Sequence, residues 1–222
     1  MQHGSTIARR PSISFHTTLE SAILSDAQLR IIPLLRQSSA EFYLAGGTAV
    51  ALHLGHRRSI DFDLFTSGAI RPSDLQRQVT KAAGPIKRTL VSSADEYSLL
   101  VAGVKLSFIA YPFEIAADTD WDGIIALPGL LPLAAMKAYA LGRRAKWKDY
   151  IDLYFLLRDH VSIDLISAEA ERTFGGNFNS RLFREQLIWF EGIDFSEQVE
   201  FMPGFAVTEA EVQAFLLDAV RR

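Results

Sequence analysis

The sequence predicts an α+β fold, in which a mixed or antiparallel sheet with flanking helices is followed by an all-helical C-terminal half. Two patterns indicate this fold: strand-like runs mix with helical periodicity up to about residue 127, and only helical periodicity follows. The chain has 222 residues, of which 49% are hydrophobic and 22% charged, so it can bury a sizeable core. We expect two domains, residues 1–127 and 128–222.

The expected elements of the first half follow from local patterns. Capping boxes predict helix starts, glycine pairs and Ala-Gly predict turns, and alternating apolar residues predict strands. Pro33 is expected to kink a helix or to begin a new one. In order, we expect helices after the capping boxes at residues 17–20 and 25–28, a strand at 42–44, a helix at 48–54 ended by Gly55, a strand at 60–65, a helix from Pro72, and strands at 86–91, 97–101 and 104–111.

The second half is expected to hold helices alone. Apolar residues recur there at intervals of three and four, which is the period of an amphipathic helix. The predicted helices are residues 131–141, 148–158, 163–172, 181–190 and 209–221, the last preceded by a capping box at 208–211. Phe183, Leu187, Trp189 and Phe190 share one such pattern, and we expect them in the core.

Composition excludes several classes of function. With no cysteine, the chain has no disulfides, thiolate zinc sites, iron–sulfur clusters or cysteine nucleophile. The net charge is −3, so any contact with nucleic acid depends on a local patch. We find neither a secretory signal nor an apolar run of the roughly 20 residues that cross a membrane. We therefore expect a cytoplasmic protein with no membrane partner.

The strongest local pattern is a glycine turn followed by a pair of aspartates. Asp61 and Asp63 lie two apart on a predicted strand, so both carboxylates point to one face. Two adjacent carboxylates repel unless a cation lies between them, and Mg²⁺ takes one or two carboxylates together with phosphate oxygens. Gly46 and Gly47 allow a close backbone approach, and the helix that begins near Thr48 offers N–H groups to phosphate. This order predicts a metal–nucleotide site.

Two motifs then resemble a known family. Residues 44–66, which hold the Gly-Gly-Thr turn, a His-Arg-x-Ser stretch and the acidic pair, look like the first motif of the AbiEii/AbiGii toxins. Residues 136–157, a Lys-x-x-Ala helix running to arginine and then an Asp-x-x-Asp helix, resemble the family's later motifs. These toxins belong to the nucleotidyltransferase superfamily related to DNA polymerase β. The resemblance implies a nucleotidyltransferase-like fold for the first half.

The resemblance also implies roles for single residues. Asp61 and Asp63 would be catalytic and bind Mg²⁺, and Lys137 and Asp152 would be catalytic as well. The residues implied to bind the nucleotide are Gly46, Gly47, Thr48, Arg57, Ser59 and Arg144.

The second motif can also be read from its charges. Lys137 and Arg144 are two helical turns apart, and Arg143, Lys146 and Lys148 enlarge a positive cluster that could neutralise a triphosphate. Asp149 and Asp152 share the next helix face, where Asp152 could orient Lys137 or a guanidinium, or deprotonate the acceptor hydroxyl. Spacing alone favours a solvated charged face. His53 and His56 have no further metal ligand nearby, so we read His56 and Arg57 as a turn that braces the site.

The chain departs from the superfamily at one position. Many of its enzymes carry a third carboxylate on a later strand, which here would be residues 104–111 and offers only Lys105 and Ser107. Either two carboxylates suffice, or the site is altered, or another acid substitutes. The candidate substitutes are Glu96, Glu114 and Asp152.

We therefore predict a Mg²⁺-dependent nucleotidyltransferase, the toxin of an abortive-infection or toxin–antitoxin pair, that moves an NMP from an NTP to an acceptor hydroxyl. By resemblance the acceptor is the 3′ end of a tRNA, and a cognate antitoxin is the expected protein partner; an aminoglycoside-type molecule or a protein hydroxyl stays open as acceptor. The alternative is a non-catalytic nucleotide-binding or antitoxin-partner module with a degenerate site. A weaker third reading is transfer of the γ-phosphate to a protein.

Overall fold

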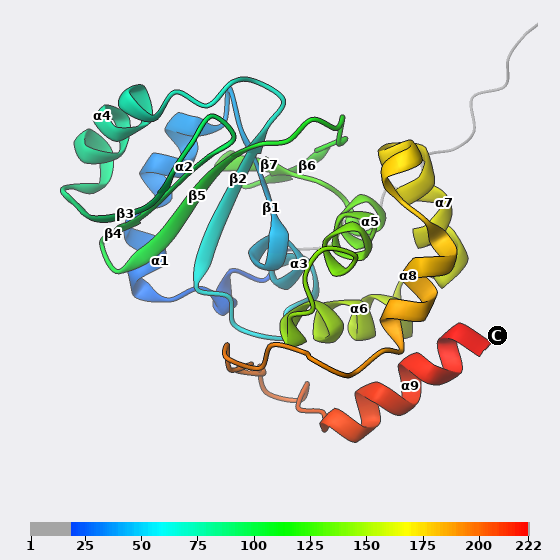
Figure 1. The fold of residues 1–222 in the computed structure, drawn as a ribbon. Helices are drawn as coiled ribbons and strands as arrows, with labels where there is room; N and C mark the ends of the chain where they lie inside the picture. Colours follow the sequence, from blue (N-terminus) through cyan, green and yellow to red (C-terminus); the bar gives the residue numbers. More distant parts are fainter. Residues whose placement is uncertain (1–18, 222) are drawn as a thin grey trace, which may run out of the picture.

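A five-stranded sheet forms the centre of the N-terminal half in the computed structural model, which describes residues 19–221 (Figure 1). Its strand order is β1-β2-β5-β4-β3, with β2 and β5 parallel and every other neighbouring pair antiparallel. The predicted α+β class, with a mixed sheet and a helical C-terminal half, is confirmed. The strands are β1 (Tyr43–Ala45), β2 (Asp61–Thr66), β3 (Ile86–Ser92), β4 (Glu96–Val101) and β5 (Val104–Ala110).

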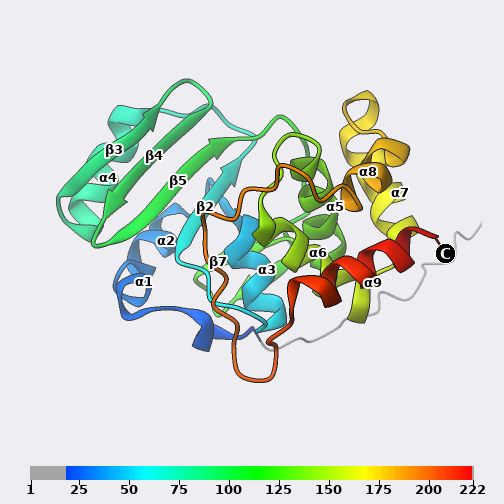
Figure 2. The same ribbon diagram turned by 60° about the horizontal axis from the view of Figure 1, so that its bottom comes forward.

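Helices flank this sheet and build the second half. α4 packs against β3 and β4, whereas α3 packs against β1 and β2 and also against α5 and α6. Figure 2 shows α5 to α9 gathered on one side of the molecule, beside α3. The helices are α1 (Asp26–Arg30), α2 (Ile32–Ser38), α3 (Gly46–Leu54), α4 (Pro72–Ala83), α5 (Leu130–Leu141), α6 (Trp147–Asp159), α7 (Ile163–Phe174), α8 (Ser180–Leu187) and α9 (Glu209–Arg221), with short 3-10 turns at Ser21–Ile23 and Gly175–Asn177.

Several local predictions are confirmed. Ser25 and Gln28 form a complete capping box, and α2 begins with a proline in its first turn. Gly55 ends α3 in the left-handed conformation, and residues 102 and 103 form the tight turn between β4 and β5. The capping box at residues 17–20 begins outside the described residues. Because α3 contacts α5 and α6, the two halves share one hydrophobic core, and the division at residue 127 stays a prediction.

Other local predictions are wrong. The glycine turn is not a separate loop, since Gly46 and Gly47 already belong to the first turn of α3. A second hairpin, β6 (Thr119–Trp121) and β7 (Ile125–Leu127), lies in a region where we predicted no strand. α8 ends at Leu187, so Trp189 lies beyond the helix and is 61% exposed instead of buried. Phe183 and Leu187 are buried as expected, and Phe190 is partly buried against the core.

The segment between α8 and α9 runs across the front of the molecule in Figure 2. Its main chain pairs with two distant loops, through the bridges Lys146–Asp194 and Arg57–Phe201. The C-terminal half therefore reaches back to the first half close to β2. Within residues 19–221, the structure holds no helix with the length and apolarity that crossing a membrane requires.

Candidate active site

Asp61 and Asp63, the first and third residues of β2, form the acidic part of the candidate site. Both side chains lie on the same half-buried face of the strand, while Phe62 between them is fully buried, as predicted. The first residue of α3 approaches this face so closely that a Cβ on Gly46 would lie 2.7 Å from Asp63 Oδ2. Gly46 also has a φ of +72°, which side chains other than hydrogen rarely tolerate. Both the close contact with Asp63 and the positive φ therefore require glycine at position 46.

The electrostatics of this pair favour a bound cation. Burial raises the pKa of Asp61, and the neighbouring Asp63 raises that pKa further, while Lys105 opposes the shift. Burial likewise raises the pKa of Asp63, against the opposing effects of Lys105 and a hydrogen bond with Ser107. Two carboxylates whose charged forms are disfavoured gain stability when a cation binds between them. Their oxygen donors fit Mg²⁺.

The strand register places other side chains where a third carboxylate was expected. Lys105 pairs with Asp61 and Ser107 with Asp63 across β2 and β5. Lys105 Nζ lies 4.0 Å from Asp61 Oδ2, close enough for a weak ion pair. Within the described residues, no group of three or more His, Cys, Asp or Glu side chains could hold a metal. The acidic pair therefore has no carboxylate opposite it on β5.

The proposed substitutes lie elsewhere. Glu96 is on β4, opposite Ile109, where Ser98 donates a hydrogen bond to its carboxylate. Glu114 lines a cavity beside Thr66, at the other end of β2 from Asp61.

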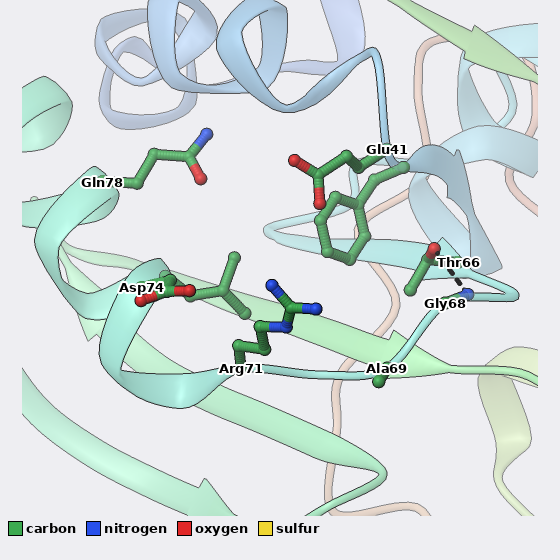
Figure 3. Close-up of a pocket in the computed structure, with 9 residues that line it drawn as sticks. Glu41, Thr66, Gly68, Ala69, Arg71, Asp74 and Gln78 are labelled. Atoms are coloured by element: carbon green, nitrogen blue, oxygen red, sulfur yellow. Dashed lines mark hydrogen bonds between the residues drawn. The ribbon is translucent and has the colours of Figure 1, made fainter.

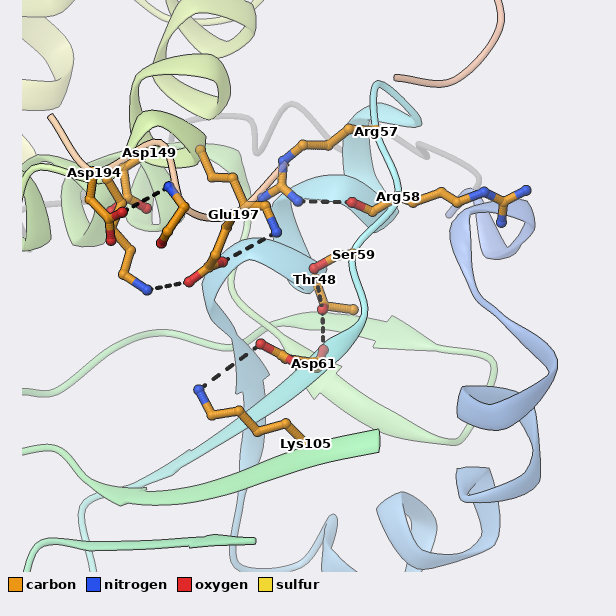
Figure 4. Close-up of polar contacts among 12 residues, drawn as sticks. Thr48, Arg57, Arg58, Ser59, Asp61, Lys105, Asp149, Asp194 and Glu197 are labelled. Carbon is orange, nitrogen blue, oxygen red and sulfur yellow. Dashed lines mark hydrogen bonds and ion pairs between the residues drawn. The ribbon is translucent and has the colours of Figure 1, made fainter. Parts of the chain in front are cut away.

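Thr48 and Ser59 brace the acidic strand from within. The Thr48 hydroxyl donates to the carbonyl oxygen of Asp61 and lies 2.8 Å from the Ser59 hydroxyl. Thr48 is 2% exposed and Ser59 is 8% exposed. These hydroxyls hold the start of α3 against the start of β2, and their predicted contact with nucleotide stays a prediction (Figure 4).

Asp152 lies at the centre of a buried network that joins the two halves. Its carboxylate accepts hydrogen bonds from Arg57 Nε at 2.7 Å and Arg57 Nη2 at 2.9 Å, and from His56 Nε2 at 2.9 Å. Lys137 Nζ lies 2.6 Å from the second oxygen of Asp152. Because a carboxylate only accepts, His56 carries its proton on Nε2, and its buried Nδ1 has no hydrogen-bond partner among residues 19–221.

The charges of this network balance. Burial opposes the charge on Asp152, but Arg57 and Lys137 outweigh it and hold the pKa of Asp152 well below its usual range. Burial lowers the pKa of His56, so this histidine is neutral at pH 7. With its oxygens taken, Asp152 is placed to orient Arg57 and Lys137, which is one of the roles predicted for it.

Arg57 also explains the second glycine of the turn. A Cβ on Gly47 would lie 2.7 Å from Arg57 Nη2, so the guanidinium packs directly on the first turn of α3. Arg57 Nη1 also donates to the carbonyl oxygen of Arg58 at 3.0 Å. Arg57 is 2% exposed, and it reaches the site as a brace beneath α3.

Lys137 and Arg144 converge, but not along one helix. α5 ends at Leu141, and Arg144 lies in the following loop. Both residues meet at Asp149, where Lys137 Nζ is 2.7 Å from Oδ1 and Arg144 Nε is 3.2 Å from Oδ2. The Arg144 side chain is 56% exposed, whereas that of Lys137 is 7% exposed. Of these two, Arg144 can reach a ligand in solvent.

The other basic residues have partners that the sequence did not indicate. Arg143 lies over the ring of Tyr139, with its guanidinium carbon 3.5 Å from the ring centre. Lys146 and Lys148 both form ion pairs with Glu197. Glu197 stands alone in the sequence, about fifty positions away, and no motif marks it. Its approach to the site is visible only in the folded chain (Figure 4).

Two cavities lie apart from this site. One of about 300 Å³ is lined by residues before β1, in the connection from β2 to α4 and on α4 itself, among them Glu41, Arg71 and Gln78 (Figure 3). Another of about 240 Å³ shares Glu41 and Thr66 with it. No residue predicted to bind nucleotide or metal lines either cavity.

The fold, with the acidic pair beside α3, resembles that of solved nucleotidyltransferase structures. Residues 34–123 match the family model described as nucleotidyl transferase AbiEii toxin, type IV TA system. The predicted resemblance to the AbiEii toxins is confirmed for this segment, which contains Asp61, Asp63 and the glycines of α3. The enzyme class predicted from the sequence is the class of this family.

Individual proteins agree with this placement. The uncharacterized protein aq_aa25 of Aquifex aeolicus (strain VF5) is 38% identical over 125 residues, which are 54% of this chain and 59% of that protein. The chain thus spans less than two thirds of this relative. Two solved structures share the fold, each with a TM-score of 0.58. One is a H. pylori protein described as a nucleotidyltransferase, 14% identical, with 88% of this chain and 92% of that chain covered. The other is MenT4, the nucleotidyltransferase toxin Rv2826c from Mycobacterium tuberculosis H37Rv, 16% identical, with 87% and 80% covered.

Proposed function

We propose that the chain is a Mg²⁺-dependent nucleotidyltransferase that transfers the NMP of an NTP to an acceptor hydroxyl at the 3′ end of a tRNA. We further propose that it is the toxin of a cytoplasmic toxin–antitoxin pair and that a cognate antitoxin binds it. The observation that carries the proposal is the pair of Asp61 and Asp63 against the first residue of α3. The match of residues 34–123 to the AbiEii model supports it.

Different residues of the site would bind the metal, bind the phosphates and neutralise the pyrophosphate. Asp61 and Asp63 would hold Mg²⁺, which supplies positive charge to the phosphate oxygens of the substrate. The N–H groups of Gly46 and Gly47 would bind phosphate, because Ala45 at the N-cap offers them no side-chain acceptor. Arg144, which is exposed, would neutralise the departing pyrophosphate.

The buried network would serve as a frame for these groups. Asp152 fixes Arg57, and Arg57 in turn packs on Gly47 at the start of α3. Lys137 links Asp152 with Asp149, which is the residue that holds Arg144. We assign Asp152 to positioning, because its oxygens already accept from three side chains.

A non-catalytic nucleotide-binding or antitoxin-partner module is the second candidate. Lys105 and Ser107 stand in register with the acidic pair, where a third carboxylate would otherwise lie. A site altered in this way would bind NTP and Mg²⁺ without forming a product. Measuring nucleotide binding and transfer in the same preparation separates the two candidates.

The test uses purified protein, Mg²⁺, total tRNA and the four NTPs, each labelled in turn at the α- or the γ-phosphate. We expect α-label on tRNA with wild type, and at least a hundredfold slower labelling with Asp61→Asn or Asp63→Asn, because each removes a metal ligand. Asp74→Asn is the matched control, because Asp74 is an exposed aspartate on α4 that pairs with Arg77. Label on protein instead of tRNA would contradict the acceptor, γ-label would indicate phosphotransfer, and binding without product would favour the module.

A further inference from the structure

A strap formed by residues 194–202 crosses the edge of the site and is anchored at both ends. At one end, Asp194 N donates to the carbonyl oxygen of Ala145 at 2.7 Å. At the other end, Arg58 N donates to the carbonyl oxygen of Glu200 at 2.8 Å. The strap thus joins the loop before α6 to the loop before β2.

Glu197 lies in the middle of this strap, with its carboxylate between two lysines. Its Oε1 forms an ion pair with Lys146, and its Oε2 lies 3.2 Å from Lys148 Nζ. The two lysines, with the hydrogen bond of Lys146 as the largest cause, lower the pKa of Glu197 to about 2. The Glu197 side chain is 42% exposed. The lysines thus hold an anionic group at a position open to solvent.

This ion pair faces the acidic pair. Glu197 is close enough to raise the pKa of Asp61, and Lys148 is close enough to lower it. Figure 4 shows Glu197 in the same region of the site as Thr48 and Asp61. A phosphate chain that reaches Asp61 through a metal ion would extend toward the same lysines. It would find a carboxylate already bound there.

We propose that Lys146 and Lys148 form a phosphate subsite of the NTP site, which Glu197 fills in the nucleotide-free protein and leaves when the nucleotide binds. The inference rests on the proposed function, since it assumes a triphosphate at Asp61 and Asp63. A phosphate group carries more charge than a carboxylate, so it forms the stronger pair with two lysines. Departure of Glu197 also removes a negative charge that disfavours ionised Asp61. Glu197 therefore weakens nucleotide binding by competing for the lysines.

The test measures equilibrium binding to the full chain and needs no transfer step. The probes are inorganic triphosphate and the four α,β-methylene NTPs, each with Mg²⁺. We expect Glu197→Gln to bind them about three- to tenfold more tightly, as the loss of half-exposed ion pairs to a competitor allows. Glu200→Gln is the matched control, because it removes the same charge from the same strap but pairs with Arg58 instead of the lysines.

Each result of the binding measurements supports or overturns the proposed phosphate subsite. A gain with Glu197→Gln that Glu200→Gln lacks, and that disappears when Lys148→Ala is added, supports the subsite. Equal affinity of the two variants and wild type overturns it. Weaker Mg²⁺-dependent binding by Glu197→Gln overturns it as well, because Glu197 would then help to hold the metal. Failure of the proposed function appears separately, as a gain in binding without any transfer product; no binding at all would overturn both.

Discussion

Two groups of charged side chains lie on either side of α3 and differ in how fully their charges are matched. Asp152 is fully buried, and Arg57 and Lys137 compensate its charge. Asp61 and Asp63 are half-buried, lie beside each other, and have raised pKa values. The charge of the first group is compensated within the protein, so this group stabilises the fold. The charges of the second group are not compensated in this way, so this is the group that would bind a cation.

The largest expected difference between the two groups is in the free energy of unfolding of their alanine variants. We expect Asp152→Ala to lower the free energy of unfolding by about 3–5 kcal/mol, because it leaves the buried Arg57 without its carboxylate partner and Lys137 with Asp149 alone. Asp63→Ala should change it by about 1 kcal/mol or less, because no buried cation depends on Asp63 for its pairing. Urea unfolding monitored by circular dichroism measures both values.

Asp159→Ala is the control for Asp152→Ala. Asp159 lies on the same helix and pairs with Arg158 at the surface, so its loss should cost about 0.5 kcal/mol. If Asp152→Ala were as mild as Asp159→Ala, the network would not be the frame that we describe.

The acidic pair could be predicted from the sequence, because a strand fixes which side chains share a face. The alternation of residues 60–65 placed Asp61 and Asp63 together, and the tight turn at residues 102 and 103 predicted the pairing of β4 with β5. A helix after the two glycines was anticipated as well, although it begins at Gly46 instead of Thr48. The acidic pair and the presence of this helix follow from short-range patterns, and the structure confirms both.

The buried network could be anticipated only in part. Spacing placed Asp149 and Asp152 on one face, but not their burial or the arrival of Arg57 from the other half of the chain. Glu197 could not be anticipated, because its contact with Lys146 depends on the path of an irregular segment. The helical period also misled us for Trp189, which continues an apolar pattern after α8 has ended at Leu187.

A second prediction concerns Gly46, the glycine of α3 that lies against Asp63. We expect Gly46→Ala to cost about 2–4 kcal/mol, of which roughly 1–2 kcal/mol comes from a left-handed backbone and the rest from the clash with Asp63. Gly103→Ala is the control, because Gly103 has a φ of +85° but nothing within 4 Å of its would-be Cβ. Combining Gly46→Ala with Asp63→Ala should recover the excess cost. An additive double mutant in urea unfolding would contradict the clash.

The smallest expected effect is a difference in pH dependence between the two groups. Burial raises the pKa of Asp63, so from its unfolded pKa near about 4 up to its folded pKa the native state binds more protons, and stability falls as pH rises. Asp152 has a lowered pKa, so its contribution is complete above about 4 and is lost as pH falls through its folded pKa. We therefore expect Asp63→Asn to stabilise the metal-free protein at pH 7 relative to pH 4, by at most about 1 kcal/mol after screening by solvent. Urea unfolding with a chelator at both pH values measures this change, and Mg²⁺ should reverse it by stabilising wild type alone. An equal effect of Asp63→Asn at pH 4 and pH 7 would show that the acidic pair is as well compensated as Asp152.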